Sequence, residues 1–361
     1  MVWAPEDFFG KHLPLALLTG FLGSGKTSLL NQLLRDPRMA DTAIAINEFG
    51  DIGLDQHFVE AGDDDVILLA NGCMCCLAGD QIEQSLARIF QRSADGEIPA
   101  FKRLVIETSG MADPEFVLQS ILDSQIMSRF LWLDSIVTTV DSLFGVQQIG
   151  QHHEAAKQVR LADRLVITKA DMVDAERLAQ VRDALADINP AARQIVKAND
   201  DVDISLLFSP AFFDGGEKGS LLGAWAEKQL LHRGEGSHAH AEGEPCNHGC
   251  DDGSPHVAHA STFTLTADSP VDWHRFTLWL GEQQRKYGDR LLRVKGLLNV
   301  RGTDDPVVVH AVQSVMHVPV SLKKWPDEDR RTRIVFILNG EDEGLSGDWT
   351  DFLARSSTPV L

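Results

Sequence analysis

The chain has 361 residues and a formal net charge of −20 at pH 7, and a chain of this length can bury two separate cores, so we expect two domains. The negative charge argues against nucleic acid and membrane surfaces as partners, and no stretch reaches the roughly 18 uncharged apolar residues of a membrane span, so we expect a soluble, cytoplasmic protein. Its 5 cysteines are too few for a disulfide framework, which favours metal binding or redox chemistry.

The first predicted strand, 13–18, runs into a glycine-rich turn and then into a helix with leucines at helical spacing. The turn reads GFLGSGKT and matches GxxxxGK[ST] in full. In such a turn backbone N–H groups surround a phosphate, Lys26 reaches the terminal phosphates, and the Thr27 hydroxyl suits magnesium. A chance glycine-rich turn is the alternative, and the flanking strand and helix argue against it. The motif predicts a nucleotide site at Gly20, Gly23, Ser24, Gly25, Lys26, Thr27 and Ser28.

Two further predicted strands, 42–46 and 66–69, each end in a loop with candidate metal ligands. NEFGD follows the first strand, and Glu48 is a candidate oxygen ligand there, with a solvated loop acid as the alternative. NGCMCC follows the second strand, and thiolates suit zinc, copper(I) or cobalt. A strained disulfide or a redox-active pair are the alternatives. The pattern predicts a transition-metal site at Cys73, Cys75 and Cys76.

The predicted strand 103–107 ends in an acid, Glu107, and a glycine, Gly110, follows three residues later. A carboxylate at this place suits a magnesium-bound water, and the glycine N–H suits the γ-phosphate of a nucleotide. Together with the glycine-rich turn, this favours a catalytic role for Glu107 over a plain carboxylate at a strand end.

The predicted strand 164–168 runs into Lys169 and Asp171 within the sequence TKAD. An aspartate there accepts two N–H groups of guanine that adenine lacks, while the lysine stem covers the ring. Thr168 stands where GTPases commonly have asparagine, which leaves the strength of the guanine preference open. A surface KxD is the alternative, and the upstream motifs favour GTP as the ligand.

Strands and helices alternate along the first two hundred residues, which predicts an α/β domain with a P-loop, doubly wound, mainly parallel sheet. Loops at the carboxyl ends of such strands meet at one edge, where ligands bind. The further expected strands are 136–140 and 194–196, and the expected helices are 28–34, 81–92, 114–122, 154–162 and 175–188.

The stretch 232–259 holds six of the 13 histidines among glycines, serines and acids. It cannot bury a core, so we expect a flexible arm with weak metal sites, and a merely solvated linker is the alternative. The chain then divides into a nucleotide domain (1–213), this linker (214–260) and a small α+β domain (261–361), in which we expect strands at 262–266, 291–300, 307–312 and 333–338 and a helix at 271–283. The weak linker ligands are His238, His240, Cys246, His248 and Cys250.

GFLGSGKTSLL, NEFGDIGLD, NGCMCC, ETSG and TKAD, in this order, resemble the CobW family of P-loop GTPases, and the segment 262–339 resembles that family's small C-terminal domain. In this family glutamate stands in the third motif where most GTPases carry aspartate. The resemblance implies a GTP-hydrolysing metal-trafficking protein, which handles zinc in several branches and cobalt or nitrile hydratase metal centres in others. It also implies that Gly72 and the three cysteines after it form a metal site beside the GTP switch.

Three functions stay open at this point. The first is a GTPase that delivers zinc or cobalt to a client metalloprotein; the second is a P-loop ATPase or kinase with structural cysteines; the third is a non-catalytic zinc buffer or sensor. TKAD argues against the second, and the intact Lys26, Thr27 and Glu107 argue against the third. We expect slow unaided hydrolysis because the sequence assigns no arginine finger. The choice between zinc and cobalt, the client, and whether the chain forms a homodimer are not specified.

Overall fold

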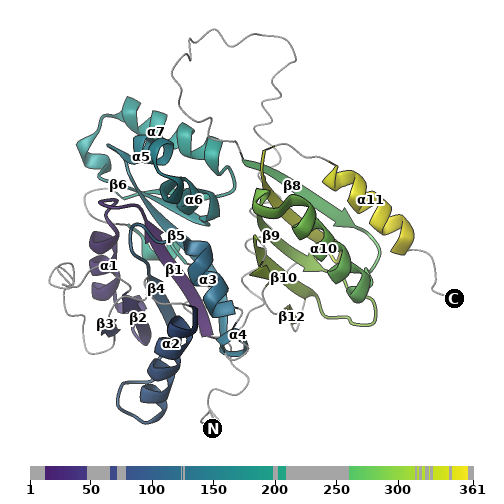
Figure 1. Cartoon of the computed structure of the whole chain (residues 1–361), viewed down its shortest axis with the longest axis horizontal. Coiled ribbons are helices and arrows are strands. Elements are labelled where there is room, and N and C mark those ends of the chain that lie inside the picture. Colours follow the sequence, from purple (N-terminus) through teal and green to yellow (C-terminus); the bar gives the residue numbers. More distant parts are fainter. Residues whose placement is uncertain are drawn as a thin grey trace.

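The chain folds into two lobes in the computed structural model (Figure 1). The structure describes residues 13–46, 66–70, 79–122, 124, 127–197, 202–208, 260–313, 315–316, 319–321, 325, 328–340 and 344–356. Within this part of the chain no helix is long and apolar enough to cross a membrane. The expected domain division falls partly on residues outside these ranges, so its exact boundaries stay a prediction.

The first lobe is built on a parallel sheet. Among the described residues seven strands pair in the order β3-β2-β4-β1-β5-β6-β7, and every neighbouring pair is parallel. This confirms the α/β prediction. The strands are β1 (Leu13–Gly20), β2 (Thr42–Ile46), β3 (Val66–Ala70), β4 (Arg103–Glu107), β5 (Leu131–Asp141), β6 (Arg164–Thr168) and β7 (Arg193–Val196).

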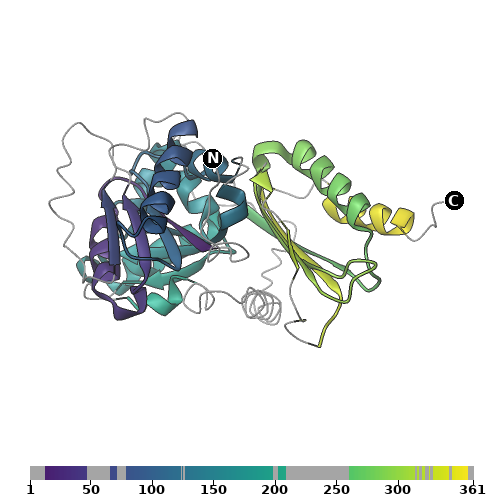
Figure 2. The same cartoon turned by 90° about the horizontal axis from the view of Figure 1, so that it is seen from below.

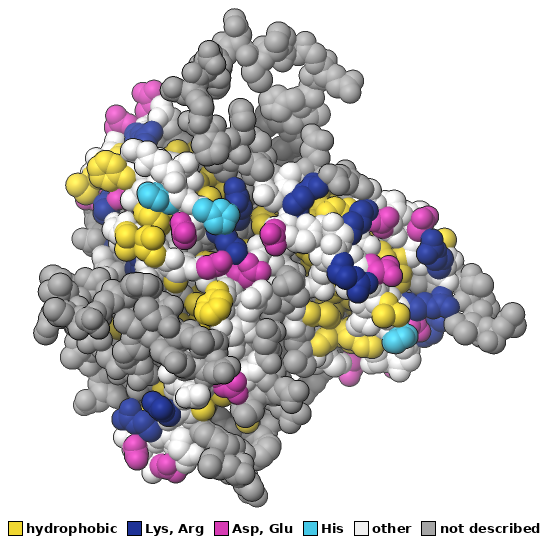
Figure 3. Space-filling model, in the orientation of Figure 1, with side chains coloured by type: hydrophobic (Ala, Val, Ile, Leu, Met, Phe, Trp, Pro, Cys, Tyr) yellow, Lys and Arg dark blue, Asp and Glu magenta, His cyan; other side chains and the backbone are white. Residues whose placement is uncertain are grey.

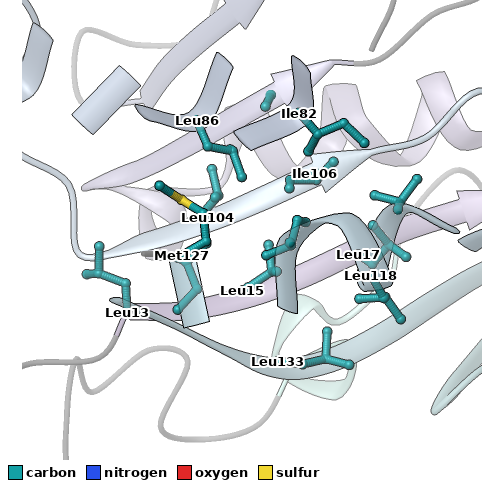
Figure 4. Packing of buried hydrophobic residues seen from close by; sticks show 14 of the residues in the cluster. Leu13, Leu15, Leu17, Ile82, Leu86, Leu104, Ile106, Leu118, Met127 and Leu133 are labelled. Atoms are coloured by element: carbon teal, nitrogen blue, oxygen red, sulfur yellow. The ribbon is translucent and has the colours of Figure 1, made fainter. Parts of the chain in front are cut away.

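Helices cover both faces of this sheet because the strands are apolar on both sides. Leu15 and Leu17 of β1 join one core cluster, while Ala16 and Leu18 join another. The helices are α1 (Lys26–Arg35), α2 (Gly79–Ala94), α3 (Pro114–Leu122), α4 (Met127–Phe130), α5 (Gly145–Gln151), α6 (His153–Leu161) and α7 (Ala175–Ile188), with short 3₁₀ segments η2 (Pro37–Met39), η4 (Ala170–Met172) and η5 (Ile204–Leu206). Figure 4 shows the cluster in which side chains of α2 and α3 pack on β1, β4 and β5.

The second lobe is an antiparallel sheet covered on one face by two helices (Figure 2). In the described part of this lobe the strand order is β11-β10-β9-β13-β8, and β12 also pairs with β10. This confirms the α+β expectation. Its elements are β8 (Ala260–Ala267), α10 (Trp273–Tyr287), η7 (Gly288–Arg290), β9 (Leu291–Leu298), β10 (Val307–Val312), β11 (Val315–Met316), β12 (Val320–Ser321), β13 (Thr332–Asn339) and α11 (Leu345–Ser356).

A buried ionic cluster joins the two lobes. Asp163, between α6 and β6, lies 2.7 Å from Arg293 Nη2 and 2.8 Å from Lys295 Nζ, both on β9. Asp163 also accepts the backbone N–H of Ile136 at 2.9 Å. Burial alone would raise the pKa of Asp163, but the positive charges around it outweigh burial and hold the pKa at about 2. The carboxylate is therefore charged at neutral pH and holds β9 against the nucleotide domain.

Candidate nucleotide site

The predicted nucleotide residues gather at the carboxyl-end edge of the parallel sheet. Strand register fixes this arrangement, since Leu18 pairs with Glu107, Gly20 pairs with Thr139, and Asp141 pairs with Thr168. The glycine-rich turn after β1, the loop after β4 and the TKAD loop after β6 thus start from neighbouring or next-neighbouring strands. This is the edge at which doubly wound sheets bind ligands.

The glycine-rich turn has a backbone that only glycine accepts at two places. Gly20 has φ 145°, and a Cβ there would lie 2.2 Å from the Thr139 hydroxyl oxygen. Gly25 has φ 91° and forms the N-cap of α1, and a Cβ there would lie 3.2 to 3.3 Å from the Thr168 side chain. The turn is therefore shaped by close approach of β5 and β6 as well as by its own sequence.

Side-chain donors hold the carbonyl groups of this turn. Lys26 Nζ donates to the Gly20 carbonyl at 2.7 Å and to the Phe21 carbonyl at 3.2 Å. Lys169 Nζ donates to the Gly23 carbonyl at 2.9 Å. A carbonyl and the N–H of the same peptide unit point in opposite directions, so fixing the carbonyls also fixes the direction of the N–H groups. These hydrogen bonds thereby fix a backbone geometry of the kind that binds anions.

Thr168 contributes a contact that the sequence did not reveal. Its hydroxyl donates to the Ser24 carbonyl at 2.7 Å, and the side chain is 3% exposed. The Ser24 hydroxyl shares a 2.7 Å hydrogen bond with Thr139. Thr168 therefore ties the glycine-rich turn to β6, a structural role that does not depend on an amide side chain.

Asp141, at the end of β5, is a further site residue that the motif search missed. Its carboxylate accepts Lys169 Nζ at 2.6 Å and the Leu143 N–H at 2.7 Å. Lys169 has φ 55°, so this lysine lies in the left-handed region with its ammonium group held from two sides. The sequence signal was an aspartate directly after an apolar strand in TTVDS. Asp171 is the middle residue of the neighbouring segment η4, and its side chain is exposed.

The loop after β4 touches the glycine-rich turn through backbone. Glu107 ends the strand and is 8% exposed, and the Thr108 hydroxyl donates to Thr19 Oγ1 at 2.8 Å. A Cβ on Gly110 would lie 2.8 Å from the backbone nitrogen of Leu22. Glycine at 110 is thus required by the close approach of the two loops. Because the loops are in contact, a shift of one loop would displace the other.

The predicted transition-metal ligands lie outside the described residues. These are Glu48, Cys73, Cys75 and Cys76 near the sheet and His238, His240, Cys246, His248 and Cys250 in the linker. Within the ranges that the structure describes, no three His, Cys, Asp or Glu side chains are close enough to hold a metal ion. The metal sites therefore stay predictions from the sequence.

Comparison with known proteins identifies the family. Residues 14–196 match the sequence family described as CobW/HypB/UreG, nucleotide-binding domain, and residues 260–348 match the cobalamin synthesis protein cobW C-terminal domain. The chain belongs to the CobW/HypB/UreG family. Each lobe of this CobW/HypB/UreG protein thus matches one of the two family domains. The resemblance drawn from its motifs is confirmed.

Several relatives of this CobW/HypB/UreG protein match along most of its length. The zinc chaperone YjiA of Escherichia coli is 29% identical over 326 residues, which is 90% of this chain and 93% of that protein. The zinc chaperone CobW of Pseudomonas aeruginosa is 29% identical over 358 residues, 90% of this chain and 87% of that protein. The crystal structure of Zn(II)-bound YjiA GTPase from E. coli has a TM-score of 0.58 at 24% identity, and covers 96% of this chain and 99% of that one. This structural likeness supports the fold.

Proposed function

We propose that this protein is a GTPase that binds zinc and delivers it to a client metalloprotein under control of the GTP cycle. The observation that carries the GTPase part is the ordered glycine-rich turn, whose carbonyl groups are held by Lys26, Thr168 and Lys169. Family membership supports the same reading, because the curated relatives include a zinc-regulated GTPase metalloprotein activator from Schizosaccharomyces pombe, 33% identical over 191 residues. That match covers 51% of this chain and 45% of the yeast protein.

Four residues are proposed to carry the phosphate chemistry. Lys26 would move its ammonium group from the Gly20 carbonyl toward the β- and γ-phosphates, where it offsets developing negative charge. The N–H of Gly110, beside Leu22, would contact the γ-phosphate. The Thr27 hydroxyl and the Glu107 carboxylate are oxygen donors of the type that magnesium prefers, so they would hold Mg²⁺, which neutralises phosphate charge during transfer. Unaided hydrolysis would be slow.

The guanine preference is assigned to the TKAD loop. Asp171 is exposed at the site edge and would accept the two guanine N–H groups that adenine lacks. Lys169 is held by Asp141 and Gly23, so its aliphatic stem offers a fixed surface for the base. Selectivity for GTP then rests on Asp171 rather than on residue 168, because Thr168 is engaged with the glycine-rich turn.

The metal part of the proposal rests on NGCMCC and on the names of the relatives. Three thiols after β3 would form the tight site, with Glu48 as a further ligand, and the linker histidines and cysteines would form weaker, faster-exchanging sites. β3 is two strands from β4 in the sheet, so this loop would stand near the nucleotide edge. Zinc is the proposed cargo, and cobalt is the alternative.

The test of nucleotide choice is a competition titration with a fluorescent guanine nucleotide. GTP should bind at least about tenfold more tightly than ATP, since a charged hydrogen-bond pair supplies the roughly 1.4 kcal/mol that this ratio needs. Asp171→Asn should remove most of this preference by weakening GTP binding. Asp187→Asn is the matched control, because Asp187 is an exposed aspartate on α7, away from the TKAD loop.

Equal affinities for GTP and ATP in the wild-type protein would contradict the GTPase assignment and favour the ATPase or kinase alternative. Tight GTP binding without any turnover, in the presence of magnesium, would favour the buffer or sensor alternative. Lys26→Ala should abolish turnover in a protein that still folds, because the side chain donates to carbonyl groups of the turn and belongs to none of the buried apolar clusters of the nucleotide domain.

A further inference from the structure

The loop that reads the γ-phosphate in the proposed function is held from α6. Gln158 is fully buried, and its Nε2 donates to the Gly110 carbonyl at 3.1 Å and to the Ala112 carbonyl at 3.1 Å. One amide group thus fixes two peptide units of the loop. Because the Gly110 peptide lies against Leu22, the position of Gln158 decides how the loop faces the glycine-rich turn.

The residue before it in the same helix holds the far end of this loop. Lys157 Nζ donates to Asp113 Oδ2 at 2.7 Å and to Glu115 Oε2 at 2.5 Å. Burial lowers the pKa of Lys157, but its hydrogen bonds with both carboxylates outweigh burial and raise the pKa, so the ammonium stays charged. Figure 3 shows acidic side chains on the nucleotide domain beside its boundary with the C-terminal domain. Lys157 and Gln158 therefore hold the loop as one unit.

Glu115 is also contacted from the other lobe. Gln313 lies between β10 and β11 and is 5% exposed, and one end of its side-chain amide lies against both carboxylate oxygens of Glu115. We assign this end as the nitrogen, because an amide oxygen there would face only acceptors. Its φ of 49° is rare for a non-glycine residue. Its N–H donates to the Leu292 carbonyl at 3.1 Å, and Gln284 donates to its carbonyl at 3.1 Å. The C-terminal domain thus fixes Gln313 against the acid that pairs with Lys157.

We propose that Gln158 is a positioning residue for the γ-phosphate loop and that Gln313 of the C-terminal domain sets its position through Glu115 and Lys157. This inference rests on the proposed GTPase function and adds a regulatory input to it. The C-terminal domain raises the rate of hydrolysis when Gln313 is docked on Glu115. Gln313 acts only through other residues and makes no contact with the nucleotide.

We call the chain of contacts from Gln313 through Glu115 and Lys157 to Gln158 the relay. Thermodynamic linkage requires it to act in both directions. A γ-phosphate that draws the Gly110 N–H toward it displaces the carbonyl groups that Gln158 holds. Lys157 and Gln158 are consecutive, so the displacement reaches Glu115 and then Gln313. If docking of Gln313 favours the loop position that binds the γ-phosphate, then the γ-phosphate must favour docking by the same factor. A client that contacts the C-terminal domain would in this way alter the hydrolysis rate.

An exchange of the amide and the carboxylate between positions 115 and 313, called the swap below, tests the relay in the full-length protein. Gln313→Glu places a second carboxylate against Glu115 and should separate the pair. The double variant Glu115→Gln, Gln313→Glu restores one amide facing one carboxylate. Gln91→Glu is the matched control, because Gln91 Nε2 donates to the Asp95 carboxylate at 2.7 and 2.8 Å in the same manner on the surface of α2. Steady-state GTP hydrolysis, GDP affinity and melting temperature are measured for each variant.

The expected result is a loss in kcat with binding preserved. Gln313→Glu should lower kcat at least about fivefold, within the range of couplings between contacting residues, and leave GDP affinity within about twofold. The swap should restore only part of the lost kcat, because residue 115 then offers Lys157 an amide oxygen, which is a weaker acceptor than the Glu115 carboxylate. Gln158→Leu should lower kcat at least as much, and adding Gln313→Glu to it should have little further effect, because both act on one loop.

Unchanged kcat in a folded Gln313→Glu protein, or a swap with a kcat no higher than that of Gln313→Glu alone, overturns the relay. A second measurement covers variants that fold poorly: amide hydrogen exchange of residues 307–313 in the wild-type protein, with GDP and with a non-hydrolysable GTP analogue. Slower exchange with the GTP analogue supports the relay, and identical exchange overturns it. If the wild-type protein neither binds nor hydrolyses GTP, the proposed function fails instead, and the same exchange comparison with and without ATP decides the relay.

Discussion

At the scale of single residues, the structure changes what Thr168 means for nucleotide recognition. In the sequence this residue departs from the asparagine that is common in GTPases, and it weakens the expectation of guanine binding. In the structure its hydroxyl holds the Ser24 carbonyl 144 positions away in the chain. A contact between residues so far apart depends on strand register, so no local pattern could have indicated it.

Thr168→Val should weaken nucleotide binding about five- to tenfold, because it keeps the shape of the side chain and removes the donor for the Ser24 carbonyl. GTP and GDP should weaken equally, since the lost contact orders the turn and touches no γ-phosphate. The measurement is nucleotide affinity by fluorescence. Thr42→Val is the control: the Thr42 hydroxyl is buried on β2 without a hydrogen-bond partner among the described residues, so its loss should leave affinity unchanged. Equal affinities for Thr168→Val and wild type would show that the contact is dispensable.

At the scale of secondary structure, elements with strong apolar periodicity were predicted well. One strand with a buried acid was predicted too short, and two helices were missed. The strand expected at 136–140 begins earlier, at Leu131. It was predicted too short because Asp134 interrupts the apolar run in the sequence, yet Asp134 is only 7% exposed in the structure. Asp134 interacts electrostatically with Arg293, which comes from the other domain, so the local sequence did not indicate its burial. Helices α5 and α11 were also missed. The first is short and contains two glycines, and the second lies in a stretch rich in acidic residues that reads as a polar loop. The glycine-rich turn and the two later loops were predicted because their chemistry is local.

The ionic cluster between α6 and β9 gives a pH prediction. Burial lowers the pKa of Lys295 and the charge of Arg293 lowers it further, to about 8, although Asp163 opposes both. The pKa of lysine in an unfolded chain is about 10.4. Between these values the unfolded state holds more protons than the folded state, so the free energy of unfolding should rise with pH, by an amount on the order of 3 kcal/mol.

Urea unfolding across that pH interval, compared between the wild-type protein and Lys295→Met, isolates this contribution. The free energy of unfolding of the wild-type protein should rise relative to Lys295→Met as pH increases. Lys286→Met is the control, since Lys286 lies in an exposed pair with Asp348, which raises its pKa, and its difference from wild type should stay flat over the same interval. A flat profile for Lys295→Met as well would mean that the buried ammonium is stabilised by contacts other than those described.

At the scale of the whole molecule, the proposed function requires nucleotide and metal to affect each other. The candidate switch loop with Glu48 follows β2, the three thiols follow β3, and Glu107 ends β4, which pairs with β2. These loops leave neighbouring strands of one sheet edge. Ordering of one loop by GTP should therefore alter the geometry of the others.

Zinc should bind more tightly to the GTP form than to the GDP form, because an ordered switch loop can add Glu48 to the thiol ligands. A coupling of about 1 to 3 kcal/mol corresponds to a five- to 150-fold change in zinc affinity. Titration against a zinc indicator, with GDP and with a non-hydrolysable GTP analogue, measures it. Deletion of residues 233–258 should remove only weak zinc equivalents, whereas serine at Cys75 and Cys76 should remove the tight, nucleotide-dependent one. Identical affinities in both nucleotide states would end the chaperone mechanism, even in an active GTPase.

The position of β1 in the middle of its sheet has a consequence for synthesis of the chain. β1 pairs with β4 and β5, so both of its neighbours lie far downstream in the sequence. At translation rates of about 5 to 20 residues per second, the apolar segment LPLALLTG leaves the ribosome several seconds before either neighbour exists. During that interval it is an unpaired strand of the kind that associates with other chains. We therefore expect this apolar segment to be exposed to aggregation until β4 and β5 have been made, although the finished fold buries every residue of the strand.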